Sequence, residues 1–270
     1  MTPLLSVRGL SVQYRHGNET VEALNDVSFD LAPGERLAII GESGSGKSTL
    51  ALALGGLLPV GSTVSGQILW PALGRQPSNG SDIGFVFQDP SGSLDPLMQV
   101  GDQIVEVLRA NQHMRGADAK TRALQLIDRV ALPEAAVIAA SYPHQLSGGQ
   151  RQRVAIACAI AAGPKFLIAD EATSALDTVI QAEIMRLIEK LVREEGLALI
   201  FITHDIALAS SIGERIVVLH EGRMIEMGRP ETIISHPVQN YTRRLVSSYI
   251  ALDASPMVRP LADALATGAQ

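Results

Sequence analysis

The chain has 270 residues, of which 46% are hydrophobic and 19% charged, enough apolar sequence for one large packed domain or two closely joined ones. Its net charge of −6 argues against a nucleic-acid partner, because contacts to a phosphate backbone need clustered Lys and Arg side chains. The longest apolar stretches are too short to cross a bilayer, and the first residues lack the pattern of a signal peptide. We therefore expect a cytosolic protein, and its single cysteine, Cys158, fits a reducing compartment.

In chain order, the first segment is residues 4–31, where short strand-like runs flank a turn at residues 16–18 and predict an antiparallel layer. The apolar run 36–40 then leads directly into a glycine-rich loop, and residues 47–58 follow as a predicted helix. The order of strand, glycine loop and helix is the context in which such a loop binds phosphate. Residues 70–81, rich in Pro, Gly and Ser, are predicted to form a surface loop.

Beyond this loop, strand-like and helical segments alternate. Apolar runs predict strands at residues 82–87, 166–169, 198–202 and 215–219. Helical periodicity appears at residues 100–109, 117–130, 149–162 and 179–194. This alternation predicts an α/β fold with a mostly parallel sheet and helices on both faces. Residues 91–141 are almost wholly helical and separate two parts of one core, so they predict an inserted helical subdomain.

The glycine-rich loop, Gly41-Glu-Ser-Gly-Ser-Gly-Lys-Ser-Thr49, is the first chemical signal. Its glycines let backbone N–H groups wrap a β-phosphate, and the N-terminus of the following helix favours the anion. A chance glycine loop before a helix is the alternative, and the full nine-residue match argues against it. Lys47 is expected to reach the β- and γ-phosphates of ATP, and Ser48 to hold Mg²⁺ through its hydroxyl. The nucleotide-binding candidates in this loop are Gly41, Ser43, Gly44, Ser45, Gly46, Lys47, Ser48 and Thr49.

The second signal is the acidic end of a predicted strand, Phe166-Leu-Ile-Ala-Asp170-Glu171. The strand places Asp170 at its tip, where the carboxylate can hold Mg²⁺ through water. Glu171 points in a different direction and can orient or deprotonate an attacking water. Such a pair alone would more often begin a solvated loop. Together with the glycine loop, it predicts the acidic half of an ATPase site.

The third signal is Ser147-Gly148-Gly149-Gln150, at the start of a predicted helix. Ser147 is a good N-cap residue, and the glycines let a ligand approach the positive end of the helix. The same features describe an ordinary capped helix. The longer run Leu-Ser-Gly-Gly-Gln-Arg-Gln-Arg ends 17 residues before Asp170, and this spacing resembles the signature of the ABC-type ATPases. In that family the signature binds the γ-phosphate of ATP held by the opposite subunit.

The resemblance implies a RecA-like P-loop NTPase core and further site residues. Gln88 matches the Q-loop glutamine, which in the family touches Mg²⁺ and the water. His204 matches the switch histidine that contacts the γ-phosphate, and Asp177 matches the D-loop that crosses the dimer interface. Tyr14 lies where an aromatic ring stacks on adenine. The resemblance thus implies a catalytic set of Glu171, His204 and Gln88, and a metal set of Ser48, Gln88 and Asp170.

Within the family, the chain most resembles the dipeptide, oligopeptide and nickel importer branch. Three patterns support this: Phe87-Gln-Asp-Pro-Ser-Gly-Ser-Leu-Asp-Pro96, Tyr142-Pro-His-Gln-Leu-Ser-Gly-Gly149 and His236-Pro-Val-Gln-Asn-Tyr241-Thr-Arg-Arg-Leu245. The resemblance covers residues 4–250, with a helical subdomain at about 91–146 and a C-terminal extension at about 230–250. Residues 251–270 are expected to be loosely ordered. The chain departs from its relatives in a short segment 70–81, in a tail without iron–sulfur cysteines, and in Ala172 where many have Pro.

The resemblance implies an ATPase that powers import of small peptides, nickel or related solutes. Two ATPase subunits, identical or related, would close head-to-tail on two ATP molecules and move two membrane permease subunits. An extracytoplasmic solute-binding protein would take part indirectly. The expected location is the cytoplasmic face of the bacterial inner (plasma) membrane, as a peripheral protein.

Two other functions stay open at this point. A soluble ABC ATPase of a non-transport assembly, such as a carbon–phosphorus lyase accessory subunit, shares the C-terminal pattern of this branch. A small-molecule kinase built on the glycine loop is the other, although it has no use for residues 146–150. Residues 88–96 favour the importer, because in the family they contact the membrane partner.

Overall fold

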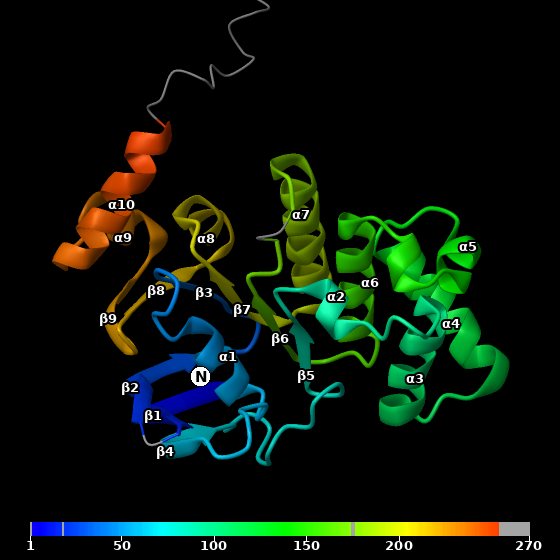
Figure 1. Ribbon diagram of the computed structural model, residues 1–270, viewed down its shortest axis with the longest axis horizontal. Coiled ribbons are helices and arrows are strands. Elements are labelled where there is room, and N and C mark those ends of the chain that lie inside the picture. The colour runs from blue at the N-terminus through cyan, green and yellow to red at the C-terminus, as the bar shows by residue number, and fades with distance from the viewer. Residues whose placement is uncertain (1, 18, 174–175, 254–270) are drawn as a thin grey trace, which may run out of the picture.

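The computed structural model describes residues 2–17, 19–173 and 176–253, and within these ranges the strands form two sheets (Figure 1). The larger sheet has the order β5-β6-β7-β3-β8-β9. Its first five strands run parallel, and β9 pairs antiparallel with β8. The strands are β3 (Arg36–Ile40), β5 (Ile83–Val86), β6 (Phe166–Asp170), β7 (Ala198–Thr203), β8 (Arg215–His220) and β9 (Arg223–Gly228). The predicted mostly parallel sheet is confirmed, and β9 is an additional strand that the apolar runs did not predict.

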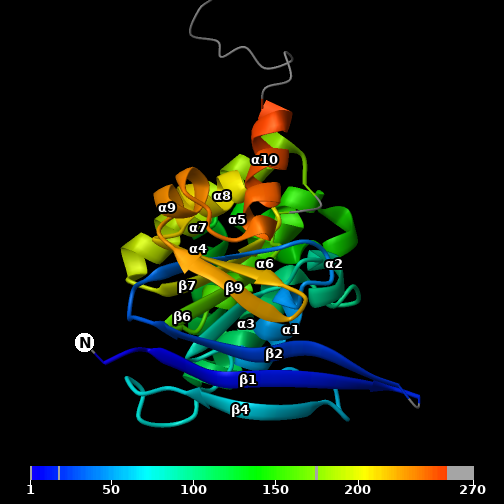
Figure 2. The same cartoon turned by 90° about the vertical axis from the view of Figure 1, so that its left-hand side faces the viewer.

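The smaller sheet is antiparallel and has the order β2-β1-β4 (Figure 2). It consists of β1 (Leu5–His16), β2 (Glu19–Leu31) and β4 (Thr63–Leu69). The predicted antiparallel layer is therefore confirmed, although Asn18 of the predicted turn lies outside the described residues. β4 was not predicted, because most of its side chains are exposed and show no apolar alternation.

Alternate residues of the central strands point to opposite faces of the larger sheet. Leu37 and Ile39 of β3 belong to a core shared with the smaller sheet and helix α1 (Lys47–Leu54). Ala38 and Ile40 point to the other face, where α8 (Ile206–Ile212) packs. On that same face, β6 and β7 contribute to a core with α6 (Gly148–Ile160) and α7 (Thr178–Glu195). The helix after the glycine loop and the helix of the signature thus cover opposite faces of the sheet.

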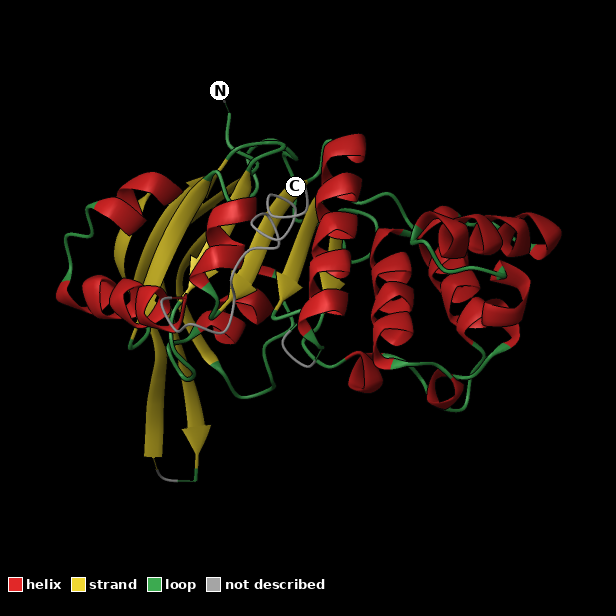
Figure 3. Cartoon of the chain, turned by 90° about the horizontal axis from the view of Figure 1, so that it is seen from above, coloured by secondary structure: helices red, strands yellow, loops and turns green. Residues whose placement is uncertain are grey.

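The predicted helices are confirmed, with ends that differ by a few residues. Helix α1 ends four residues before the predicted end, because Gly55 and Gly56 follow and Gly56 has a φ of +63°. The helices of the segment predicted as helical are α2 (Pro90–Ser93), α3 (Val100–Gln112), α4 (Gly116–Arg129) and α5 (Ala135–Ala140), followed by a short 3₁₀ helix (Pro143–Gln145). Of these, α3, α4 and α5 gather at one end of the molecule, away from the strands, whereas α2 lies beside β5 and β6 (Figure 1; Figure 3 gives a second view). No helix within the described ranges is long and apolar enough to span a membrane.

The segment between β4 and β5 is a loop, as predicted, but its first residue is buried. Trp70 is only 5% exposed, and its ring lies edge-on to Phe166 with centroids 5.5 Å apart. The loop is held by Arg75, whose Nη1 and Nη2 donate to the two carboxylate oxygens of Asp82 at 2.7 and 2.9 Å. Burial acts to raise the pKa of Asp82, yet the hydrogen bonds from Arg75 and the Ser78 amide together lower it below its usual value.

The last described residues form two helices that lie at the edge of the larger sheet (Figures 1 and 2). These are α9 (Pro230–Ser235) and α10 (Asn240–Asp253). Tyr241 and Val246 of α10 are buried in the core that also contains Ile216 and Val218 of β8. Helix α10 includes residues 251–253 of the tail that was expected to be loosely ordered, and the rest of that tail lies outside the described residues.

Candidate functional site

The glycine loop connects β3 to α1 and is closely fitted between neighbouring strands. Gly46 has a φ of +101°, and a Cβ atom there would lie 2.5 Å from the carbonyl oxygen of Ala23 in β2. A Cβ at Gly41 would lie 2.2 Å from the carbonyl oxygen of Leu219 in β8. Part of the glycine pattern is therefore required by packing within the chain, in addition to the approach of a phosphate that the sequence suggested.

Lys47 is the buried cation of this loop. Its side chain is 4% exposed, and Nζ donates to the carbonyl oxygens of Gly41 at 2.9 Å and Glu42 at 2.8 Å. Burial lowers the pKa of Lys47, while the charges of Glu171 and Asp170 act to raise it. The ammonium thus lies over the loop, close to the carboxylates of Glu171 and Asp170, in a position to contact a phosphate bound by the loop.

Glu171 is the point where the predicted catalytic residues meet. Gln88 Nε2 donates to Glu171 Oε2 at 3.0 Å, and Lys47 Nζ lies 3.9 Å from Oε1. His204 Nδ1 also lies 3.9 Å from Oε1. Gln88, Glu171 and His204 follow β5, β6 and β7, whose carboxyl ends form one edge of the parallel sheet, the usual place for a site in such folds.

The backbone of Glu171 is held in an unusual conformation. Its φ is +44°, a left-handed value that costs a non-glycine residue about 1–2 kcal/mol. The amide of Glu171 donates to the carbonyl oxygen of Ile202 in β7 at 3.0 Å, which ties the turn to the next strand. Strain of this kind persists where the surroundings fix it, and it often accompanies a functional side chain.

Asp170 has a buried carboxylate whose charge is only partly compensated. The residue is 6% exposed, and its Oδ1 has no hydrogen-bond partner among the described residues. Burial raises the pKa of Asp170; the Ser48 hydroxyl acts to lower it, Glu171 to raise it and Lys47 to lower it. An orphaned carboxylate oxygen beside a hydroxyl is a ligand set suited to Mg²⁺, which binds one or two protein oxygens together with phosphates and water. No cluster of three or more His, Cys, Asp or Glu that could hold a metal occurs in the described part of the chain.

The signature residues lie at the start of α6, where Ser147 and Gln150 form hydrogen bonds with each other. Ser147 Oγ accepts from the Gln150 amide at 3.3 Å, and Gln150 Oε1 accepts from the Ser147 amide at 2.8 Å, a capping box. A Cβ at Gly149 would lie 2.7 Å from Ile180 Cγ2 in α7 and one at Gly148 would lie 3.4 Å from Leu176. Gly149 therefore has a packing role between α6 and α7 that the sequence alone did not indicate.

The remaining candidates lie apart from the Glu171 cluster. Asp177 caps α7, where its Oδ1 accepts from the amides of Val179 and Ile180 at 3.1 and 3.0 Å. The D-loop residues Ser174 and Ala175 lie outside the described residues. The Tyr14 hydroxyl is 3.2 Å from Thr49 Oγ1, which anchors the ring beside α1.

Two contacts to the glycine loop were missed by sequence reasoning. The amide of Glu42 donates to the Tyr241 hydroxyl in α10 at 2.9 Å. The amide of Gly222, in the turn between β8 and β9, donates to the Ser45 carbonyl oxygen at 3.0 Å. Tyr241 belongs to the C-terminal pattern 236–245, which served only to indicate the branch, and the Gly222 contact leaves no sequence signal.

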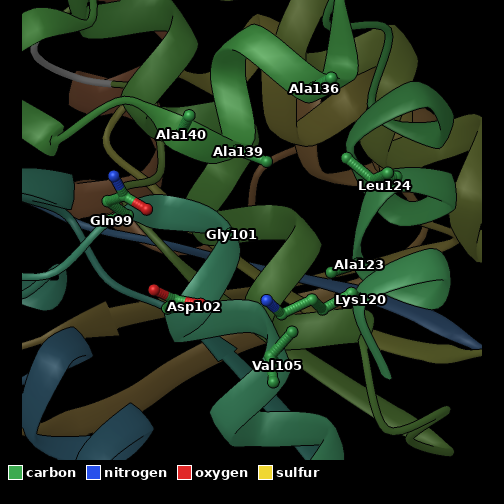
Figure 4. Close-up of a pocket in the computed structure, with 10 residues that line it drawn as sticks. All are labelled: Gln99, Gly101, Asp102, Val105, Lys120, Ala123, Leu124, Ala136, Ala139 and Ala140. Carbon is green, nitrogen blue, oxygen red and sulfur yellow. The ribbon is translucent and has the colours of Figure 1, made fainter. Parts of the chain in front are cut away.

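Two of the hollows that lie outside the glycine loop are in or next to the helical segment. One hollow, of about 280 Å³, lies between α3, α4 and α5; four alanines line it, together with Val105, Leu124, Asp102 and Lys120 among others (Figure 4). None of its described lining residues is a predicted site residue, so it is separate from the nucleotide-binding candidates. A second hollow of about 310 Å³ is lined by Phe85, Leu94, Met98 and Phe87, the residue before Gln88, among others.

The family profile described as ABC transporter matches residues 24–174, more than half of the chain. Peptidoglycan transport ATP-binding protein YejF of Agrobacterium fabrum is 43% identical over 256 residues, which are 91% of this chain and 47% of that protein. A putative peptide import ATP-binding protein of Brucella abortus is 44% identical over 260 residues, 93% of this chain and 78% of that protein. Glutathione import ATP-binding protein GsiA of Salmonella choleraesuis is 42% identical over 266 residues, 93% of this chain and 43% of that protein. The chain thus spans about half the length of the first and third of these relatives.

Solved structures of ATP-binding cassettes are also similar to this chain. A dimeric ATP-binding cassette in a post-hydrolysis state, bound to ADP and Pi, has a TM-score of 0.73 and 33% identity, covering 84% of this chain and 98% of that one. CbiO1 of Clostridium perfringens, part of the ABC transporter complex cbiONQ, has a TM-score of 0.71 and 30% identity, covering 94% and 100%. The fold and the site define a P-loop protein that binds nucleotide. The family match and the extent of these similarities show that the chain belongs to the ABC transporter family.

Proposed function

We propose that this chain is the ATP-hydrolysing subunit of an importer for small peptides, nickel or related solutes. The observation that supports ATP hydrolysis most directly is the Glu171 carboxylate, which Lys47, Gln88 and His204 approach to between 3.0 and 3.9 Å. Relatives named for peptide and glutathione import, 44% and 42% identical over 93% of this chain, support the assignment to an importer.

In the proposed chemistry, different groups of residues bind the nucleotide, activate the attacking water and hold the metal ion. Amides of the glycine loop and the Lys47 ammonium bind the β- and γ-phosphates of ATP, and Tyr14 stacks on the adenine. Glu171 orients the attacking water and accepts its proton, while His204 contacts the γ-phosphate. Ser48, Gln88 and Asp170 would hold Mg²⁺, which when bound would neutralise charge on the phosphates.

The signature acts, in this proposal, on the nucleotide of a second ATPase subunit, identical or related. The helices α1 and α6 cover opposite faces of the larger sheet, so the signature of one chain does not face its own glycine loop. Two chains arranged head-to-tail bring Ser147, Gly148, Gly149 and Gln150 to the partner's nucleotide, with Asp177 at the interface. The similarity to a dimeric cassette bound to ADP and Pi supports this arrangement.

The hollow beside Gln88 is the proposed contact with two membrane permease subunits. Phe87, which is 36% exposed, lies at this hollow and stacks on Phe85 with ring centroids 4.2 Å apart, so the surface suits an apolar segment. Motion of the helical subdomain, residues 91–146 within one ATPase domain of residues 4–250, reaches Glu171 through the Gln88 hydrogen bond. The chain then lies peripherally on the cytoplasmic face of the membrane, and an extracytoplasmic solute-binding protein acts only on the permeases.

The non-transport alternatives have less support. The relatives reported above are named for import or transport, which favours the importer over a carbon–phosphorus lyase accessory subunit. A kinase would leave the signature without a task.

Two measurements test the proposal. Phosphate release by the purified chain should require Glu171, and Glu171→Gln should still bind ATP while hydrolysis falls at least about 100-fold. Brisk hydrolysis by that variant would move the catalytic role elsewhere. A pull-down of the full chain from detergent-solubilised membranes, read by mass spectrometry, should recover two multi-spanning permease chains. Recovery of soluble proteins alone would replace the importer with a non-transport assembly.

A further inference from the structure

Helix α10 contacts the glycine loop through the hydroxyl group of Tyr241. Tyr241 of α10 is 6% exposed, and its hydroxyl accepts a hydrogen bond of 2.9 Å from the Glu42 amide. The same peptide group, between Gly41 and Glu42, presents its carbonyl oxygen to Lys47 Nζ at 2.9 Å. One peptide unit is therefore held at its N–H by Tyr241 and at its C=O by the buried ammonium. Hydrogen bonds joined in this way polarise each other.

The ring of Tyr241 is itself fixed by the sheet. It stacks on His220 at the end of β8, with centroids 3.8 Å apart and planes inclined by 22°. The start of α10 is tied to β9, because the Glu226 carboxylate accepts from the amides of Val238 at 2.9 Å and Gln239 at 3.1 Å. The contacts of Tyr241 and of the start of α10 with β8 and β9 thus fix the position of the Tyr241 hydroxyl beside the loop.

Packing alone does not account for this arrangement. A phenylalanine would fill the same space and stack on His220 equally well, whereas the hydroxyl serves only to bind a polar partner. A buried hydroxyl is favourable when it is hydrogen-bonded, and the partner here is the loop that precedes Lys47.

We propose that Tyr241 is a positioning residue for nucleotide binding, which fixes the Gly41–Glu42 peptide and through it the Lys47 ammonium. This inference rests on the proposed ATPase function. It gives the C-terminal extension, residues 230–250, a direct effect on ATP affinity. Tyr241 does not touch the phosphates in this arrangement, so its loss should weaken binding more than it slows chemistry.

The experiment compares Tyr241→Phe with Val246→Ala, a change that loosens the packing of α10 without touching the loop. Fluorescent methylanthraniloyl-ATP is titrated in EDTA, and kcat and KM are then measured with Mg²⁺. Tyr241→Phe should raise Kd and KM about fivefold, the effect of one lost neutral hydrogen bond, and leave kcat within about twofold. Val246→Ala should lower Tm and leave Kd within about twofold, because it removes only buried methyl groups.

The outcomes separate this inference from the proposed function. Unchanged Kd and KM in Tyr241→Phe, with an active wild type, would overturn the positioning role alone. An equal rise in Kd for both variants would also overturn it, since the effect would then come from loosened packing. A wild-type chain that neither binds nor hydrolyses ATP would overturn the proposed function itself.

Discussion

The contact between α6 and α7 leads to a prediction that separates two roles of Gly149. A Cβ atom at this position would lie 2.7 Å from Ile180 Cγ2, too close for either atom to stay in place. Gly149 therefore permits the approach of two helices inside one chain, whereas the family resemblance assigns it to the nucleotide of a partner. Gly149→Ala tests the packing role because it adds a single carbon.

The expected change in the free energy of unfolding on Gly149→Ala follows from two opposing effects. Forcing an extra carbon into a packed core costs about 1–3 kcal/mol, and replacing Gly by Ala inside a helix returns about 1 kcal/mol. We expect a net loss of up to about 2 kcal/mol, which for a chain of this size lowers Tm by up to about 8 °C. Ile180→Ala removes the clashing Cγ2 atom, so in that background Gly149→Ala should cost no stability. Calorimetry of the four nucleotide-free proteins measures the cycle.

The same change in Tm on Gly149→Ala in both backgrounds would refute the packing argument. ATP hydrolysis then reports on the second role. A double variant that regains the stability of Ile180→Ala but stays inactive assigns the remaining defect to the signature's contact with the partner's nucleotide. Full recovery of hydrolysis would leave Gly149 with a packing role alone.

Three further predictions follow from the site and the loop. Lys47→Ala should abolish ATP binding, as measured by calorimetric titration, because it removes the buried cation of the glycine loop; normal turnover would contradict the phosphate assignment. Ser147→Arg in one subunit of a mixed dimer should block hydrolysis on the partner's glycine loop, and an effect confined to its own nucleotide would contradict the head-to-tail arrangement. Asp82→Asn should lower Tm at pH 7, because the folded protein holds the pKa of Asp82 below its usual value. The Asp82 carboxylate therefore stabilises the fold at a pH above its unfolded pKa, and this stabilisation is lost as the pH falls through its folded pKa. A Tm difference that stays constant into acid would contradict that account.

The meeting of residues around Glu171 could be foreseen from sequence for a definite physical reason. Gln88, Glu171 and His204 each follow an apolar run of strand length, and parallel strands end at one edge of a sheet. Lys47 begins a helix directly after the glycine loop, so it reaches the same edge. Local pattern and the parallel topology thus bring these residues to one edge, whereas the resemblance to the ABC-type ATPases is what selected Gln88 and His204 as site residues.

Other features could not be foreseen, because they depend on contacts between distant segments. Tyr241 and Glu42 are 199 positions apart, and no local pattern relates them. The burial of Trp70 depends on its edge-on contact with Phe166, although its neighbours have the composition of a surface loop. Gly149 faces Ile180 only because α6 and α7 pack side by side.

The candidate site residues fall into a buried group and an exposed group, and only the exposed group would need a second subunit to cover it. Lys47, Asp170 and Ser45 are buried, and the loop around them is held by β2, by the turn after β8 and by α10. His204 is 63% exposed, and Ser147 and Asp177 are exposed as well. The residues proposed to bind the β-phosphate are thus held within one chain, while these three residues, which are proposed to act at the γ-phosphate or at the dimer interface, face outward. A single chain should accordingly bind ATP, and rapid hydrolysis should require the second subunit that covers these exposed residues.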